Sequence, residues 1–332
     1  MALTFGIFCP IHSGGFAKRQ TSDGQDPTWE EAKRVTLHAE EIGFEYNLIA
    51  ARWYGPVLEP YTTTAALASI TSRIRLIVAV HSGLFQPQLV AKMGANIDQM
   101  SGGRFHINLV SGSDDHGFQH EMYGGKWLPH DERYDVSEEY IRIVKGIWAN
   151  QPYSYEGRYY TVKDVDMQPK PVQKPVPSTF LGGKSEAARE VAAKQCDWFF
   201  IGGLGMDDIT ALRADVERRA KGYGRTLRFA IMGLMMIRDS DAEAEKEIAA
   251  LTKQAETDRT VRVYTESLKA GLWGTPERIA DRLADFSRRG FEMTLFQSRS
   301  HAEDLRRFQE QVMPLLPRAA ASDNGYLTVA DS

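Results

Sequence analysis

A short Gly-Gly-Lys-Ser segment is the first pattern in this chain that could do chemistry. It spans 182–185, after an apolar run and before a helical one. Backbone N–H groups at the start of a helix, together with a lysine and a hydroxyl, can bind an anion such as a phosphate. The same residues would also suit a tight turn with a helix cap. A Walker motif is excluded, because its leading glycine and its spacing are absent.

Other polar side chains stand just after apolar runs at several places in the chain. They are His12, Arg52, His81, Asn108, Arg299 and His301. Any one histidine could be a structural residue of a loop, whereas three of them at three different run ends favour a shared site. Metal binding is not indicated, because no His-x-His or His-Glu-x-x-His spacing occurs. His116, His120 and His130 fall on a predicted long loop at 113–129 or at its end, and we expect them to be solvated.

The elements that must position these residues alternate along the chain. Eight apolar runs are predicted to be strands, at 3–9, 44–50, 74–81, 104–110, 179–181, 197–201, 228–237 and 293–297. Helical stretches follow them, at 28–42, 61–72, 88–100, 134–149, 184–194, 207–223, 241–268 with 276–289, and 302–316. Continuous apolar strands alternating with helices indicate a covered parallel sheet. Eight such units predict a closed (β/α)₈ TIM barrel of the α/β class.

One domain is expected over 1–317, with an insertion at 151–177 and a separate tail at 318–332. Residues 153–165 alternate in polarity and carry Glu156-Gly157, which is typical of a β-hairpin. Residues 167–177 hold four prolines and must form an extended connection. An open doubly wound sheet is the alternative fold, but no Gly-x-Gly-x-x-Gly opens a helix. In a barrel, chemistry takes place at the C-terminal ends of the strands, so the polar residues above should meet on one face.

Composition and charge exclude several classes of protein. The chain has 332 residues, with 40 Lys and Arg against 44 Asp and Glu, and it lacks the basic stripe of a nucleic-acid binder. No apolar segment approaches the roughly 20 residues of a membrane span. Cys9 and Cys196 are too few for a disulfide framework or a cysteine-rich zinc site. Without a visible secretory signal, a cytoplasmic protein with no nucleic-acid or membrane partner is expected.

A more specific pattern is the string Ser-Gly-Gly-Arg-Phe-His-Ile-Asn-Leu-Val-Ser-Gly at 101–112. It resembles the signature of the bacterial-luciferase-like flavin monooxygenases. Other segments agree in order and spacing: Phe-Cys-Pro-Ile-His at 8–12, His-Asp-Glu-Arg-Tyr at 130–134, Leu-Gly-Gly-Lys-Ser at 181–185 and Gly-Thr-Pro-Glu-Arg-Ile at 274–279. The resemblance runs from about residue 3 to residue 316. Within the family, the chain is most similar to the alkanesulfonate, dimethylsulfone and pyrimidine monooxygenases.

The resemblance implies a TIM barrel that uses reduced FMN (FMNH₂) and O₂ to oxygenate a small organic substrate, an organosulfur compound or a heteroaromatic. A separate NAD(P)H:flavin reductase would supply the FMNH₂, and a homodimer or homotetramer is expected. Two alternatives stay open. One is a deazaflavin-dependent oxidoreductase on the same barrel, and the other is a non-catalytic flavin-binding protein.

The resemblance also assigns cofactor-binding residues. The FMN phosphate would be held at Gly183, Lys184 and Ser185 and by the pair Arg133-Tyr134. A dianionic phosphate favours cations and free N–H groups, so this assignment agrees with the anion site indicated by the Gly-Gly-Lys-Ser segment.

The reacting end is assigned in the same way. Asn108 would lie beside the isoalloxazine and the oxygen site, and Ala51 and Arg52 would contact the ring. His12 and His301 match histidines that line the active site of the alkanesulfonate enzymes. His81 stands at a strand end and joins them as a candidate catalytic residue.

The chain departs from the alkanesulfonate enzymes on one side of the predicted pocket. Met232 and Leu234 stand where those enzymes carry an arginine and a histidine that grip the sulfonate. Arg299 replaces a tyrosine near the end of the eighth strand and could supply an anion contact from the other side. The pocket is therefore expected to be more apolar than theirs, which argues against a simple sulfonate as the substrate.

Overall fold

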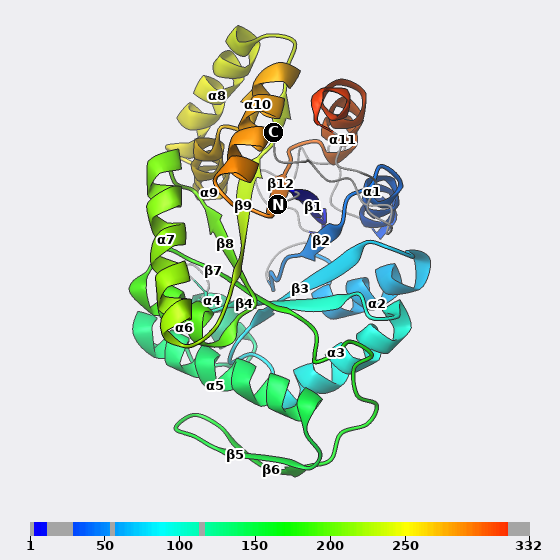
Figure 1. The fold of residues 1–332 in the computed structure, drawn as a ribbon, viewed down its shortest axis with the longest axis vertical. Helices are drawn as coiled ribbons and strands as arrows, with labels where there is room; N and C mark the ends of the chain where they lie inside the picture. The colour runs from blue at the N-terminus through cyan, green and yellow to red at the C-terminus, as the bar shows by residue number, and fades with distance from the viewer. Residues whose placement is uncertain (1–2, 12–28, 54–56, 113–116, 318–332) are drawn as a thin grey trace. The chain divides into compact units, whose positions relative to one another are not determined.

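The computed structural model describes residues 3–11, 29–53, 57–112 and 117–317. In this part of the chain, eight parallel strands form a closed barrel in the order β1-β12-β9-β8-β7-β4-β3-β2 (Figure 1). They are β1 (Thr4–Phe8), β2 (Tyr46–Ile49), β3 (Arg75–His81), β4 (Phe105–Val110), β7 (Thr179–Gly182), β8 (Trp198–Gly202), β9 (Arg228–Leu234) and β12 (Met293–Gln297). The predicted TIM barrel is confirmed.

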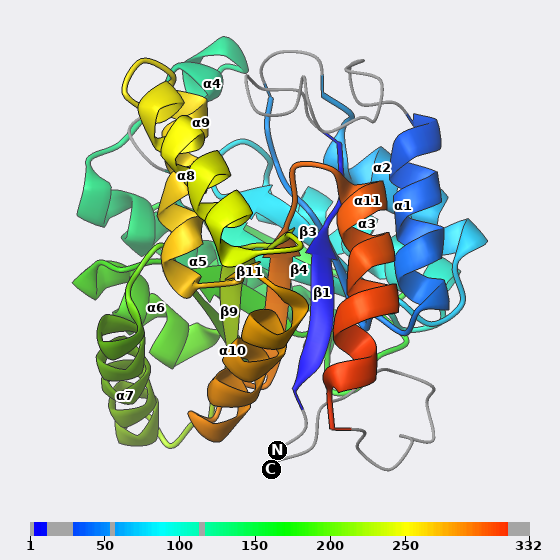
Figure 2. The same cartoon turned by 90° about the horizontal axis from the view of Figure 1, so that it is seen from above.

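Helices connect the strands, as the alternation predicts (Figure 2). They are α1 (Trp29–Glu41), α2 (Pro60–Ile70), α3 (Pro87–Ser101), α4 (Gly117–Met122), α5 (His130–Ala149), α6 (Glu186–Gln195), α7 (Met206–Gly222), α8 (Asp241–Ala255), α9 (Arg259–Ser267), α10 (Pro276–Arg288) and α11 (His301–Arg307). Short helical turns follow at η3 (Leu268–Ala270), η4 (Phe308–Val312) and η5 (Met313–Leu315). None of the helices in the described ranges is long and apolar enough to cross a bilayer.

Two helical regions differ from the prediction. The stretch predicted as one helix at 241–268 is divided into α8, α9 and η3. Asp258 explains the break, because its side-chain carboxylate accepts a hydrogen bond from the Val261 N–H (3.2 Å) and so starts a new helix. The short α4 lies inside the segment 113–129 that was predicted to be a loop.

The chain divides into two compact units. Met1–Leu58, Phe200–Ala214 and Arg228–Ser332 make up the first, and Glu59–Phe199 with Asp215–Leu227 the second. We call them the terminal unit and the central unit.

In the central unit, the packing of β4 against α3 and α5 shows which of its side chains face the barrel interior. The Phe105 ring lies edge-on against Trp148 of α5, with centroids 6.4 Å apart. A Cβ on Gly94 of α3 would lie only 2.7 Å from the Phe105 ring, so only glycine allows this close approach. Phe105 therefore faces the helices. Because side chains alternate along a strand, His106 and Asn108 face the barrel interior.

The inserted segment of the central unit forms the predicted hairpin. β5 (Tyr153–Glu156) pairs with β6 (Thr161–Val165) in antiparallel fashion. The proline-rich connection that follows is anchored to α3 through the buried Asp98 carboxylate. That carboxylate accepts hydrogen bonds from the Gln173 backbone N–H (3.0 Å) and from its side-chain amide (2.7 Å).

In the terminal unit, an aromatic cluster sets the directions of β1 and β12. The ring of Phe5 lies 5.3 Å from that of Phe308 in η4 and 5.8 Å from that of Phe296. Phe5 and Phe296 therefore face the outer helical layer. A Cβ on Gly6 would instead lie 2.8 Å from the Leu295 side chain, which places both of these residues toward the barrel interior. The next residue of β12 on the same face is Gln297.

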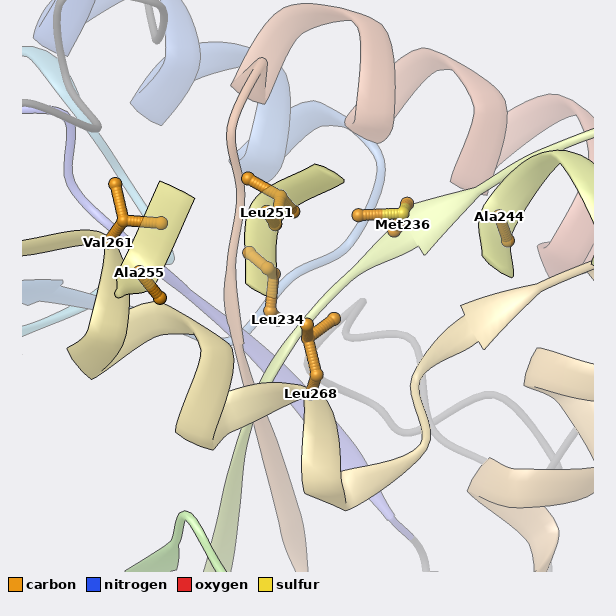
Figure 3. Close-up of a cluster of buried hydrophobic side chains, with 7 residues drawn as sticks. All are labelled: Leu234, Met236, Ala244, Leu251, Ala255, Val261 and Leu268. Carbon is orange, nitrogen blue, oxygen red and sulfur yellow. The ribbon is translucent and has the colours of Figure 1, made fainter. Parts of the chain in front are cut away.

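A second core in this unit joins α8, α9 and η3 to the end of β9 (Figure 3). Its buried residues are Leu234, Met236, Ala244, Leu251, Ala255, Val261 and Leu268. Beside it, β10 (Met236–Ile237) pairs with β11 (Trp273–Gly274) in parallel. Leu234 thus belongs to a packed core.

Candidate functional site

The turn after β7 lies against the first turn of α5. Ser185 caps α6, because its hydroxyl oxygen accepts a hydrogen bond from the Ala188 N–H (3.2 Å). A Cβ on Gly183 would lie 2.6 Å from the Ala188 Cβ and 3.4 Å from the Tyr134 hydroxyl, so this position leaves no room for a side chain. Lys184 is exposed on the same turn. The two segments predicted to hold a phosphate are therefore neighbours in space.

Arg133 precedes Tyr134 and is buried. Its guanidinium donates a hydrogen bond to the Leu128 carbonyl (3.0 Å) and a longer one to the Gly112 carbonyl (3.5 Å). The guanidinium carbon lies 4.1 Å from the centroid of the Trp127 ring, a cation–π arrangement. Arg133 thus brings a positive charge next to Tyr134 and joins the end of β4 to the segment that precedes α5.

Three buried serines tie α5 to the ends of β3 and β4. The Ser137 hydroxyl donates to the Arg133 carbonyl one turn earlier in α5 (2.8 Å). Its oxygen also lies 2.7 Å from the Ser82 hydroxyl and 2.8 Å from the Ser111 hydroxyl. A hydroxyl has only one proton, so Ser82 and Ser111 must both donate to Ser137. This serine cluster fixes the helical turn that carries Arg133 and Tyr134.

Asn108 lies in the interior of the barrel, in a row with two neighbours. Its register partners are Ala79 on β3 and Phe180 on β7. Its side-chain oxygen is buried and has no hydrogen-bond partner among the described residues. A buried polar atom without a partner is costly, and such atoms are often satisfied by a ligand or by water.

His81 ends β3 and is buried against a second histidine. Its ring stacks on that of His120, with centroids 5.6 Å apart and an interplanar angle of 15°. The His120 ring lies edge-on to Trp127 at 5.0 Å. The prediction of a solvated His120 is therefore wrong, because His81 and Trp127 cover it. His130 is exposed as predicted, and its ring contacts Asp131 (2.7 Å).

In the terminal unit, the predicted substrate-end arginine forms an ion pair. Arg299, just beyond the end of β12, binds the carboxylate of Glu247 on α8. Arg238 donates to the other oxygen of the same carboxylate, at 2.6 and 2.8 Å. Two arginines therefore share one carboxylate, so the Arg299 guanidinium is already engaged in an ion pair.

The turn between β12 and α11 carries His301 and a buried carboxylate. His301 is the first residue of α11 and is buried. The Ser298 hydroxyl donates to Asp304 and accepts a hydrogen bond from the Ser300 N–H (3.0 Å). Burial raises the pKa of Asp304 to about 6, against the lowering effects of Ser298, Arg238 and the Ser300 N–H.

Two of the remaining predicted residues follow β2, and the third is not described. Ala51 and Arg52 follow β2 and are half-buried. His12 lies outside the described residues. The contacts predicted for these three residues with the flavin ring and the substrate stay predictions.

Comparison with known proteins identifies the family of the chain. Residues 3–293 match the family described as luciferase-like monooxygenase. A FMNH₂-dependent dimethylsulfone monooxygenase of Pseudomonas putida is 30% identical over 361 aligned positions, which cover 99% of both chains. The chain belongs to the luciferase-like monooxygenase family. The predicted family is confirmed.

Solved structures of low sequence identity share the fold of this luciferase-like chain. Long-chain alkane monooxygenase (LadA) superposes with a TM-score of 0.79 at 18% identity, covering 98% of this chain and 94% of that one. Riboflavin lyase (RcaE), solved with a modified FMN and riboflavin, also has a TM-score of 0.79 at 18% identity, covering 95% and 91%. These likenesses concern the barrel alone.

The residues of this luciferase-like chain fit a flavin phosphate at the turn before α6. At this turn, which we call the phosphate cradle, Gly183 fits closely between Ala188 and Tyr134, Tyr134 and Ser185 provide hydroxyls, and Arg133 provides a positive charge nearby. The first N–H groups of a helix also lack intrahelical acceptors. The unpartnered oxygen of Asn108 suits the N–H groups of a flavin ring. Among the residues that the structure describes, no cluster of three or more metal-binding side chains occurs.

Several residues that the structure brings into view in one unit or the other were not singled out from the sequence. They are Ser82, His120, Trp127, Ser137, Glu247 and Gln297. Ser137 follows Arg133 by four residues and so shares its helix face, and this spacing could have indicated it. No local sequence pattern indicates that Glu247 pairs with Arg299.

Proposed function

We propose that this protein is the oxygenase of a two-component monooxygenase system that acts on a small organosulfur compound. A separate NAD(P)H:flavin reductase supplies FMNH₂. In the reaction, one oxygen atom of O₂ enters the substrate and the other leaves as water. FMNH₂ provides the two electrons and two protons and becomes FMN. The observation that carries the proposal is the full-length similarity to a FMNH₂-dependent dimethylsulfone monooxygenase.

The central unit supplies the cofactor end. Gly183, Ser185 and Tyr134 surround the phosphate, while Arg133 compensates part of its charge. The serine cluster of Ser82, Ser111 and Ser137 holds these groups in place before the cofactor arrives. Such preorganisation lowers the entropy cost of binding.

The bound flavin supplies the oxygenating chemistry, and Asn108 lies where it can orient the reacting ring. Its carboxamide offers both a donor and an acceptor toward the barrel interior. Ala79 and Phe180 flank it with apolar surface, which keeps water away from its side-chain oxygen. Exclusion of water matters in such a site, because protons and water divert reduced flavin and O₂ to hydrogen peroxide.

We also propose that the protein forms a homo-oligomer through the outer faces of α2 and α3. These helices pack side by side (Figure 1). The sequence of α2 contains no charged residue, and Ile70, Leu89 and Met100 are exposed. Leu89→Glu should shift the oligomer toward monomer in light scattering. An unchanged mass would contradict the assignment of this face.

The cytoplasmic location stays a prediction.

An anaerobic titration tests the proposed function directly. The apoprotein is titrated with FMNH₂ and, in parallel, with a reduced deazaflavin, and binding is followed by fluorescence. The FMNH₂ complex is then mixed with O₂ and dimethyl sulfone, with a flavin reductase for turnover, and products are identified by mass. We expect FMNH₂ binding and an oxygenated product. Binding of the deazaflavin alone would favour the hydride-transfer alternative, and binding of FMNH₂ with no product from a panel of organosulfur compounds would favour the flavin-binding protein.

A further inference from the structure

A second carboxamide, that of Gln297, lies at the C-terminal end of a barrel strand. Gln297 is the last residue of β12, and its backbone carbonyl accepts a hydrogen bond from the Met235 N–H (2.9 Å). Its side-chain oxygen is buried and has no hydrogen-bond partner among the described residues. Asn108 has the same property in the central unit, and there the oxygen faces the barrel interior.

The direction of the Gln297 side chain follows from its neighbours in the strand. Phe296 packs against Phe5, Phe44 and Phe308 and therefore faces the helical layer. Leu295 lies against Gly6 on the opposite face. Because side chains alternate along a strand, Gln297 shares the inward face of Leu295.

The neighbours of Gln297 within the terminal unit are apolar side chains and arginines that are engaged in ion pairs. On the neighbouring strand, Leu295 pairs in register with Met232, and Gln297 pairs with Leu234. Beyond the strand ends, Arg238 and Arg299 both bind Glu247. An anionic ligand would have to compete with this carboxylate for the arginines. An uncharged ligand would only need the hydrogen-bonding capacity that Gln297 leaves unused.

We propose that the Gln297 carboxamide hydrogen-bonds to the substrate and that this end of the barrel selects an uncharged substrate bearing an oxygen, such as a sulfone. A carboxamide can present either its N–H or its oxygen by rotating its terminal torsion, so it can meet an acceptor such as a sulfone oxygen. The inference rests on the proposed function and deepens it, because it names the charge class of the substrate. Gln297 is a specificity-determining residue in this account.

The test uses two probes of similar shape and different charge. Methanesulfonate has a charged oxygen in the place of one of the two methyl groups of dimethyl sulfone. Each is titrated calorimetrically into the anaerobic FMNH₂-loaded protein, so the readout does not depend on turnover. Wild-type protein should bind dimethyl sulfone and bind methanesulfonate at least about tenfold more weakly, because the sulfonate must displace Glu247 from its arginines.

The decisive variant is Gln297→Met, which keeps the volume of the side chain and removes its hydrogen-bonding groups. We expect affinity for dimethyl sulfone to fall roughly three- to tenfold, the range for one neutral hydrogen bond, while affinity for FMNH₂ stays unchanged. Gln297→Asn should restore part of the loss and serves as a second variant if Gln297→Met does not fold.

Thr294→Val is the matched control. Thr294 lies on the same strand and also carries a buried hydroxyl without a partner among the described residues, but it shares the outward face of Phe296. The control should bind dimethyl sulfone like wild type. The inference is overturned if the wild-type FMNH₂ complex binds no dimethyl sulfone, if it binds methanesulfonate as well, or if Gln297→Met matches the control. A wild-type protein that does not bind FMNH₂ would instead overturn the proposed function.

Discussion

The two units differ in the kinds of interaction that hold their predicted site residues. In the central unit, neutral hydroxyls and a helix start surround the Gly183 turn, and Arg133 is held by two carbonyls and an indole ring. In the terminal unit, Arg238, Arg299 and Glu247 form a network of opposite charges. The first arrangement places a positive charge close to hydroxyls and a helix start, which suits an anion. In the second, both arginines are engaged by the same carboxylate, with which an anionic occupant would have to compete.

A negative charge placed in the phosphate cradle should have the largest effect on cofactor binding. Ser185→Asp keeps the cap of α6, because aspartate is as good an N-cap as serine. Two negative charges about 4 Å apart repel by roughly 4 kcal/mol in a partly exposed site, so FMNH₂ affinity should fall at least about a hundredfold. Fluorescence titration measures the loss. Ser185→Asn, with the same cap and no charge, is the control, and equal affinities for the two variants would contradict the phosphate assignment.

The charge network of the terminal unit can be tested through the stability of the buried Asp304. Its folded pKa of about 6 lies above its ordinary value of 3.8, so its ionisation destabilises the folded state. The stability present below about pH 4 is therefore lost as the pH rises toward 6. Asp304→Asn keeps an acceptor for Ser298 and escapes this loss.

The free energy of unfolding of Asp304→Asn is compared with that of wild type at each pH. The difference should be more favourable to the variant at pH 7.5 than at pH 4, by up to about 3 kcal/mol. Chemical denaturation at the two pH values measures this gain. A difference between the proteins that does not depend on pH would show that Asp304 is not buried as an acid of raised pKa.

The serine cluster gives a smaller effect in the central unit. Ser137→Ala removes the group to which Ser82 and Ser111 donate, and it leaves these two buried hydroxyls without their acceptor. The free energy of unfolding should fall by about 1–3 kcal/mol. FMNH₂ affinity should fall roughly threefold or more, because Arg133 and Tyr134 lose a support. Thr64→Ala removes a comparable bond to a helix carbonyl in α2 and should leave FMNH₂ affinity unchanged.

The smallest expected effect concerns the efficiency of the reaction. Asn108→Ala should lower FMNH₂ affinity by only the few-fold that one neutral hydrogen bond contributes, and should divert O₂ to hydrogen peroxide by roughly two- to fivefold per turnover, because an orienting hydrogen bond is lost. Parallel assays of O₂ consumption, peroxide and product give this ratio. An unchanged ratio would separate Asn108 from the oxygen site.

Local patterns predicted the barrel because each strand and helix has its own period of apolar residues. The Gly183 turn was predictable for the same reason, since its glycines, lysine and serine are adjacent in sequence. The burial of His120 was not, because it depends on His81 and Trp127 from other segments. The pairing of Arg299 with Glu247 joins residues 52 positions apart, and no local pattern encodes it. Asp258 could have indicated the end of α8, since aspartate often starts a helix.

The position of Arg133 has a thermodynamic consequence for α4. Its guanidinium touches Trp127, which packs on His120, a residue of α4. If an anion draws Arg133 into a new arrangement, the stability of this short helix must change with it. Linkage is reciprocal, so whatever holds α4 in place alters the affinity for the anion by the same factor. Amide hydrogen exchange in 117–122 would therefore report on occupancy of the phosphate cradle without touching it.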